Sequence, residues 1–353
     1  MLLFRLHPLR FSFVARERIH FPAGKSSNIL RGAFGTIFRR IACVPQCTGA
    51  RECEWRAGCP YARLFEPSAI ASGPSGLADW PRPFVFRATH LDGHAAETGE
   101  TFHFDLNLFD TRPDAVAYLV LAFAQLAREG LGPERSRVDL TGVAQLDTNG
   151  REAEFAYPKV PAPLALDLAP DAPTTRVRVE FLTPTELKSG QQLAARPEFA
   201  ILAARIRDRI STLRELYGEG PLDIDFRAFG ERAALVRMTR CEVQQIDVLR
   251  RSSRTGQVHP IGGFAGEAEY EGDLAEFVPY LRAARWTGVG RQTVWGKGEI
   301  TVNDHDKVCT DEKTGAGSAI GATIERRLPP EDPGTDRGWD QQSRLARRHA
   351  IRP

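Results

Sequence analysis

The chain has 353 residues, of which 42% are hydrophobic and 26% charged, a balance typical of a soluble globular protein with room for two domains. Its formal net charge is only +2, so a polyanionic partner would have to be met by a local patch and not by the field of the whole molecule. Only six of the 47 cationic residues are lysine. The planar fork of arginine suits phosphate and base edges, although a GC-rich genome also raises the arginine content.

Membrane and secretory classes are excluded by the distribution of apolar residues and cysteines. Arg5 and Arg10 interrupt the apolar start of the chain before it reaches the length of a signal peptide. No stretch approaches the roughly 20 apolar residues of a membrane span. Four of the six cysteines fall within 17 residues, which is not a secreted disulfide framework. We therefore expect a cytoplasmic protein with no membrane partner.

Apolar periodicity predicts the same order of elements in both halves of the chain. The first half is expected to hold strands at 1–7, 84–90, 101–109 and 135–145, with helices at 27–41 and 113–128. A Pro/Ala-rich stretch at 157–175 separates the halves. The second half is expected to hold strands at 176–182, around 231–249, at 257–271 and at 296–302, with helices at 197–216 and 273–284.

Each half therefore follows the order β-α-β-β-α-β, which is the ferredoxin-like, or RRM-like, arrangement. The predicted fold class is α+β with two such domains in tandem. We place the N-terminal domain at 1–160, with a Cys-rich insertion at 43–66, and the C-terminal domain at 174–303. Residues 304–353 are rich in Asp, Gly, Pro, Lys and Arg and are predicted to be a disordered tail, with a short basic helix near "QQSRLARRHAIR" as an alternative.

A glycine-rich stretch, "WTGVGRQTVWGKGEITV" at 286–302, contains two glycine pairs with Arg291 and Lys297 among them. Glycine permits close backbone approach to a ligand, so this spacing suggests an anion-binding loop. Neither nucleotide motif fits. The dinucleotide fingerprint would need a third glycine where Thr293 stands, and the Walker A loop would need one residue fewer before Gly-Lys, then Ser or Thr.

Several motifs in order resemble the CRISPR precursor-RNA processing endoribonucleases of the repeat-associated RAMP superfamily. They are "LRGAFG" at 30–35, "CPYARLFEP" at 59–67, "FLTPTELKSG" at 181–190, "RRSSRTGQVHPIGGFAGEAEYEG" at 250–272, and the glycine-rich loop. The resemblance covers roughly 300 residues. It implies paired ferredoxin-like domains that bind CRISPR repeat RNA and cut it at one phosphate without a catalytic metal.

Two loops are the candidate RNA contacts under this resemblance. In the glycine-rich loop, glycines allow backbone approach and cations supply charge, and the alternative is a purely structural helix-to-strand turn. At the second loop, arginine and serine beside a hairpin-like reversal are usual phosphate and sugar contacts, and the alternative is a solvated turn. The candidate RNA-binding residues are Arg31, Arg250, Arg251, Ser252, Ser253, Arg254, Gly288, Gly290, Arg291, Gly296, Lys297 and Gly298.

The catalytic candidates are His20, Lys25 and His259. His20 lies between the first strand and the first helix, a region that the resembled family often uses, and Lys25 follows five residues later. His259 lies on the arginine hairpin. A single histidine is more often a packing or surface residue than a base. Tyr61 is a further hydroxyl, although "CPYARLF" favours packing for it. Some family members keep a histidine after the first helix, where this chain has cysteines.

Those cysteines, Cys43, Cys47, Cys53 and Cys59, have the spacing C-x3-C-x5-C-x5-C. Four thiolates in a short segment can close a tetrahedral structural zinc site. The spacing is not that of common zinc ribbons, so an iron-sulfur cluster or reduced, unligated thiols remain open. Isolated Cys241 and Cys309 are read as a core and a tail residue.

The sequence thus predicts an endoribonuclease that binds CRISPR repeat RNA and matures precursor transcripts into guide RNA. Cleavage by the substrate's own 2′-hydroxyl would leave a 2′,3′-cyclic phosphate and a 5′-hydroxyl and would need no cofactor. The alternatives are a non-catalytic RAMP subunit that holds guide RNA in a CRISPR effector complex, and a general single-strand RNA-binding protein. Repeat RNA is the expected partner, with other CRISPR effector subunits as further candidates.

Overall fold

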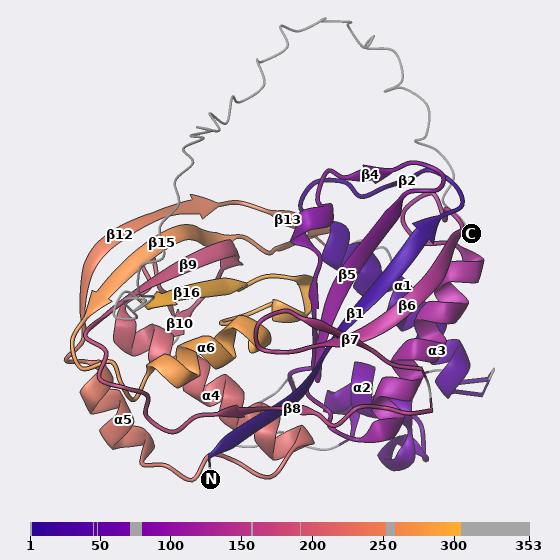
Figure 1. Cartoon of the computed structure of the whole chain (residues 1–353). Helices are drawn as coiled ribbons and strands as arrows, with labels where there is room; N and C mark the ends of the chain where they lie inside the picture. Colours follow the sequence, from indigo (N-terminus) through magenta and orange to yellow (C-terminus); the bar gives the residue numbers. More distant parts are fainter. Residues whose placement is uncertain are drawn as a thin grey trace, which may run out of the picture. The chain divides into compact units, whose positions relative to one another are not determined.

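The computed structural model describes residues 2–44, 46–47, 49–70, 80–156, 158–190, 192–251 and 258–304. The predicted tail with its alternative short helix, and Cys309, lie outside these residues. Two modules of the same topology make up the described part of the chain, and both belong to one compact unit (Figure 1).

The N-terminal module has the predicted β-α-β-β-α-β order in an antiparallel sheet with strand order β3-β5-β1-β6, extended at one edge by β7. Helices α1 and α3 contact each other along one face of this sheet (Figure 1). The elements are β1 (Leu3–Ala15), α1 (Ser26–Ala42), β3 (Phe84–Arg87), β5 (Thr101–Leu108), α3 (Pro113–Glu129), β6 (Val138–Leu146) and β7 (Glu152–Glu154).

The C-terminal module repeats the order, with the sheet β12-β15-β9-β16 and the helices α4 and α6 in contact with each other. Its elements are β9 (Arg176–Thr185), α4 (Phe199–Tyr217), α5 (Phe226–Ala233), β12 (Arg237–Ile246), β15 (Gly263–Glu271), α6 (Val278–Thr287) and β16 (Ile300–Asp304). In both modules the spatial order of the four main strands is second, third, first, fourth. The predicted fold class, two tandem ferredoxin-like modules, is confirmed.

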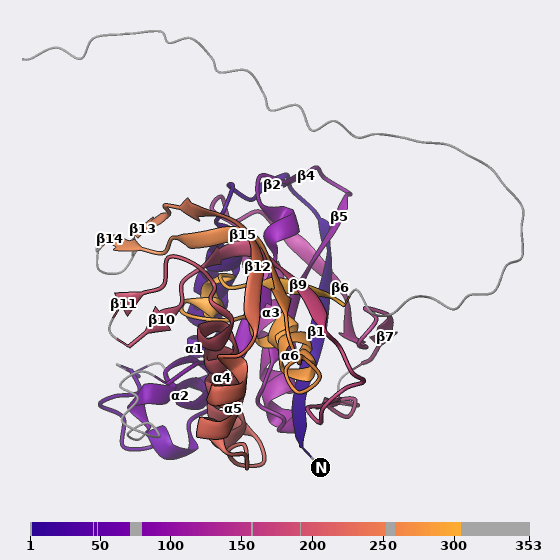
Figure 2. The same ribbon diagram turned by 90° about the vertical axis from the view of Figure 1, so that its left-hand side faces the viewer.

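Short elements decorate this framework. Two hairpins project from the C-terminal module, on the same side in Figure 2. The short elements are β2 (Ile19–His20), η1 (Arg56–Gly58), α2 (Pro60–Phe65), η2 (Pro67–Ala69), η4 (Thr89–Leu91), β4 (Ala95–Ala96), β8 (Leu164–Asp167), β10 (Lys188–Ser189), β11 (Gln192–Leu193), β13 (Leu249–Arg251), β14 (Val258–Pro260) and η5 (Thr293–Trp295).

One predicted strand was placed wrongly. The strand expected around 231–249 begins only at Arg237, and the residues before it form α5. This short helix starts where the Asp225 carboxylate accepts hydrogen bonds from the backbone amides of Arg227 and Ala228, which satisfies two of the free N–H groups at a helix start. The first strand is also longer than expected, because β1 continues to Ala15.

Strand β1 contributes to the cores of both modules. Leu9, Phe11 and Phe13 are buried in the N-terminal core under α1 and α3. Phe4 and Leu6 lie on the other face of the strand and are buried in the C-terminal core. The modules therefore share apolar surface and do not meet as two separately closed domains. None of the helices in the described part of the chain is long and apolar enough to cross a membrane.

Candidate nucleic-acid interface

The glycine-rich loop connects the end of α6 to β16, at the junction of the two modules. All four of its glycines have positive φ, between 68° and 78°, a conformation that L side chains rarely adopt. A Cβ atom on Gly290 would overlap the Glu186 carbonyl, and one on Gly298 would overlap the Val289 carbonyl. Contacts within the protein thus explain why glycine is needed at these positions, without a bound ligand. This agrees with the alternative that the loop is a structural helix-to-strand turn.

The loop packs against the first turns of α1 in the other module. A Cβ atom on Gly296 would collide with the Ser27 side chain, so only glycine allows this approach. The Arg31 guanidinium lies over the Trp295 ring, 5.7 Å from its centroid, and over Phe65 at 4.8 Å. Arg31, which was predicted from a distant motif, therefore lies beside the loop.

Three polar side chains hold the end of α6, from which the loop starts. The last carbonyls of a helix have no partner within the helix. Asn107 donates to the Trp286 carbonyl at 2.9 Å, and Arg209 donates to the Thr287 carbonyl at 3.0 Å. Arg87 donates to the Arg285 carbonyl at 3.1 Å and, at 3.5 Å, to Trp286. We call these three residues, Arg87, Asn107 and Arg209, the helix clamp.

The clamp also places two positive charges at the negative end of the helix dipole. Burial lowers the pKa of Arg87, opposed by Glu299, whose carboxylate lies 3.9 Å from its guanidinium. Burial, and then repulsion from Arg87, lowers the pKa of Arg209 to about 9. The Arg209 guanidinium therefore remains charged at neutral pH. Because the clamp comes from β3, β5 and α4, it fixes the loop relative to both modules.

The two cations of the loop have different environments. Half of the Arg291 side chain is exposed, and its guanidinium forms an ion pair with Glu186 at 2.5 Å. Lys297 is only 7% exposed, and burial lowers its pKa, opposed by the charge of Asp92. Arg291 could meet a phosphate only in competition with Glu186, and Lys297 is buried.

His20 and Lys25 lie on the segment that leads into α1, and both are exposed. His20 is paired with Ala95 in the short β2–β4 ribbon. Lys25 is the N-cap residue of α1. Its neighbour Ser26 donates its backbone amide to Asp92 at 3.0 Å, and Asp92 is the same carboxylate that faces Lys297. Both candidates therefore lie on the chain segment next to the α1 turn that receives the glycine-rich loop.

The third catalytic candidate lies elsewhere. His259 is in β14, where its backbone pairs with Arg250 of β13. Arg251 is in the same ribbon, opposite Val258. Ser252, Ser253 and Arg254 lie outside the described residues. Tyr61 is 5% exposed and donates to Glu66 at 3.2 Å, so the packing interpretation of Tyr61 is the one that its surroundings favour.

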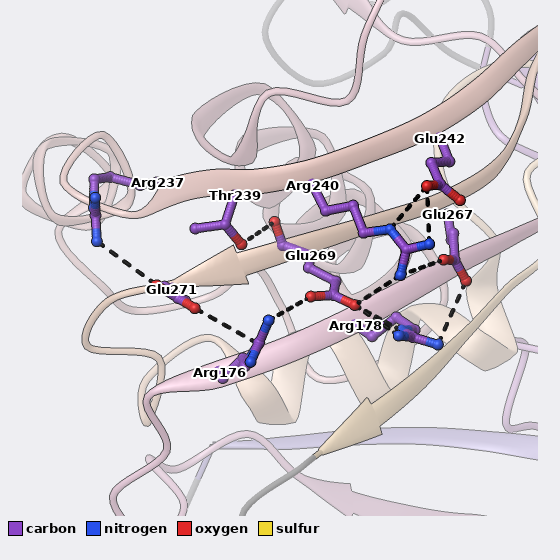
Figure 3. A network of polar contacts seen from close by, with 9 residues as sticks. All are labelled: Arg176, Arg178, Arg237, Thr239, Arg240, Glu242, Glu267, Glu269 and Glu271. Atoms are coloured by element: carbon purple, nitrogen blue, oxygen red, sulfur yellow. Dashed lines mark hydrogen bonds and ion pairs between the residues drawn. The ribbon is translucent and has the colours of Figure 1, made fainter.

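The open face of the C-terminal sheet carries arginines that are paired within the protein (Figure 3). Glu269 accepts from Arg178 at 2.7 Å and from Arg176 at 2.7 Å, and these hydrogen bonds lower the pKa of Glu269. Arg240 reaches Glu242 at 2.8 Å. The other ion pairs of the face join Arg178 to Glu267, Arg176 and Arg237 to Glu271, and Arg240 to Glu267 and Glu269. Alternating charges of this kind make the face a poor phosphate site.

The four cysteines lie between α1 and α2. Cys43 is the C-cap of α1 and Cys59 the N-cap of α2, with their sulfurs 3.9 Å apart. Cys47 and Cys53 line the same cavity as this pair. Among the described residues, no group of three or more histidine, cysteine, aspartate or glutamate side chains is arranged to hold a metal ion.

Sequence reasoning missed the helix clamp. The signal for Arg87 was present, because a cation directly follows the apolar run "FVF" in a buried strand. Such a charge is rarely buried without a partner. Asn107 and Arg209 carry no comparable signal, since each occupies an ordinary polar position in a strand or helix pattern.

The fold and the clamped loop define a protein of two ferredoxin-like modules with a glycine-rich loop at their junction. Residues 179–300 match the family model of the CRISPR-associated endoribonuclease Cas6, and residues 4–166 match a model described as an N-terminal domain. Residues 179–300 therefore form a Cas6 family domain. No curated protein matches the chain significantly.

Solved structures support the fold. The product complex of a Cas6 from Thermus thermophilus is similar over 85% of this chain and 99% of its own, with 17% identity and a TM-score of 0.52. A chain of a partial Cas6-RT-Cas1–Cas2 complex has the same TM-score and 12% identity. That match covers 87% of this chain and 48% of the other.

Proposed function

We propose that this protein binds CRISPR repeat RNA at the module junction and cleaves precursor transcripts there through the 2′-hydroxyl of the RNA, without a catalytic metal. The observation that carries the proposal is the contact between the family-matched domain and the other module. The glycine-rich loop packs on α1 through Gly296 and Ser27, beside the segment with exposed His20 and Lys25. The proposal thus draws its cations and its histidine from both modules.

The reaction needs no activated water. The 2′-oxygen next to the scissile phosphate attacks phosphorus, the bond from phosphorus to the 5′-oxygen breaks, and the products are a 2′,3′-cyclic phosphate and a 5′-hydroxyl. One proton leaves the 2′-hydroxyl and one is delivered to the departing 5′-oxygen. The protein must hold these atoms in line, move both protons and neutralise the phosphoryl charge.

We assign the roles as follows. His20 is the general base, since a neutral imidazole can accept the proton of the 2′-hydroxyl and this side chain is exposed. Lys25 and Arg291 neutralise charge on the phosphoryl oxygens. Arg250, Arg251 and the serines and arginine that follow them position the RNA backbone without reading its sequence. His259 is the alternative base.

The test uses repeat RNA with a single 2′-deoxy sugar just before the scissile phosphate, in the presence of a chelator. We expect one cut in the unmodified RNA and none in the deoxy RNA, while affinity changes little because one hydroxyl contributes only about 1 kcal/mol of hydrogen bonding. His20→Ala should reproduce the block. His94→Ala is the matched control, because it removes another exposed histidine from the neighbouring loop.

The outcomes separate the proposal from its rivals. Cleavage of the deoxy RNA would refute attack by the 2′-hydroxyl, and loss of cleavage in chelator would refute metal independence. Binding of unmodified RNA without any cleavage favours the non-catalytic subunit that holds guide RNA. If the deoxy block holds while His20→Ala stays active, the base is sought at His259 and the mechanism stands.

A further inference from the structure

The segment between α1 and α2, Cys43 to Cys59, has almost no core of its own. Among its described residues only Ala50 is buried, and Trp55 is 73% exposed. A backbone segment of this length that buries so little apolar surface cannot offset the entropy of its ordering. Proteins fix such segments with disulfides or metal ions.

The thiols of this segment already converge. Cys43 and Cys59 cap the two flanking helices, so the ends of the segment are anchored, and their sulfurs lie 3.9 Å apart. Four sulfurs at about 2.3 Å from one zinc ion are about 3.8 Å from each other in a tetrahedron. The spacing of the Cys43–Cys59 pair is therefore that of two ligands on one zinc.

The other two cysteines are placed to complete the set. Cys47 and Cys53 line the same cavity of about 520 Å³ as Cys43 and Cys59. The carbonyl groups of Val44 and Ala50 hold the amides of Cys47 and Cys53 in tight turns. Binding of one ion by all four thiolates would require these two turns to carry their sulfurs to the first pair.

We propose that Cys43, Cys47, Cys53 and Cys59 bind one structural zinc ion that fixes the segment after α1. A site with four thiolate ligands is saturated, so the ion has no open position for substrate. It would instead hold α2 against the C-terminal end of α1. Because α1 also receives the glycine-rich loop at its other end, a fixed C-terminal end keeps this helix in one place.

Elemental analysis of the full chain, purified under reducing conditions, tests the proposal. We expect about one zinc ion per chain in the wild type and in the control Cys241→Ser, since Cys241 lies in β12, outside the cluster. The double variant Cys47→Ser/Cys53→Ser should hold less than about a tenth of that zinc. Cobalt should replace zinc with the absorption of a tetrahedral thiolate centre, and chelator should speed proteolysis between residues 43 and 59.

Other results would overturn the proposal. They are a folded wild-type protein without zinc, equal zinc in the double variant, iron with inorganic sulfide in place of zinc, or a Cys43–Cys59 disulfide in the reduced preparation. If the double variant does not fold, the cobalt spectrum and the chelator experiment on the wild type still decide. Neither depends on RNA cleavage, so failure here leaves the proposed function untouched.

Discussion

The helix clamp makes a quantitative prediction through Asn107→Leu. Asn107 is 2% exposed and donates one hydrogen bond, 2.9 Å long, to the Trp286 carbonyl. Leucine has a similar volume, so the change removes a donor without opening a large cavity. The Trp286 carbonyl then keeps only the 3.5 Å contact from Arg87.

The magnitude follows from the cost of a buried acceptor without a partner, about 1–3 kcal/mol. We expect the free energy of unfolding to fall by about 2 kcal/mol, which corresponds to a drop of about 3 °C in the melting temperature for a protein of this size. RNA affinity should fall as well, because the glycine-rich loop starts one residue after the clamped carbonyls.

Urea unfolding and RNA titration of the two proteins measure these changes. The control is Asn149→Leu, an exposed asparagine in a turn, for which we expect a change within about 0.5 kcal/mol. If Asn107→Leu also lowers the free energy of unfolding by less than about 0.5 kcal/mol, the clamp is not an energetic link between the modules. Lost stability with unchanged RNA affinity would separate the clamp from the loop's function.

Two further predictions concern charge. Arg291→Ala should weaken RNA binding and reduce the slope of log affinity against log salt concentration by roughly 0.7. Lys297→Ala should mainly lower the free energy of unfolding, since Lys297 is 7% exposed. Equal effects of the two variants on the slope would contradict this difference. Burial lowers the pKa of His7 in the folded protein. As the pH falls, the imidazole of His7 is therefore protonated in the unfolded chain before it is protonated in the folded one. Stability should be complete above about pH 6.5 and fall as pH drops toward the folded pKa. His7→Leu should reduce this loss in urea titrations at several pH values, and an unchanged loss would exclude His7 as a source.

The order of the main elements could be predicted from the sequence because it rests on local patterns. Strands such as 101–109 alternate apolar and polar residues, and the helix at Pro113 begins and ends with local signals, proline at its first position and Gly130 after its last. The capping signal of α5 was equally local. Asp225 was overlooked, and the last residues of α5 were assigned to the strand expected around 231–249.

The chemistry of the junction depends on contacts that no local pattern carries. Asn107 and Trp286 are 179 residues apart, and only the packing of one module on the other brings them within hydrogen-bonding distance. In the folded protein Lys297 is buried and Arg291 stays half exposed beside Glu186, although the sequence presents both as equal cations of one loop. Composition and periodicity determine which segments become strands and helices, since those depend on neighbours along the chain. The environment of each charge depends on what the other module covers, and that is decided only when the two modules fold together.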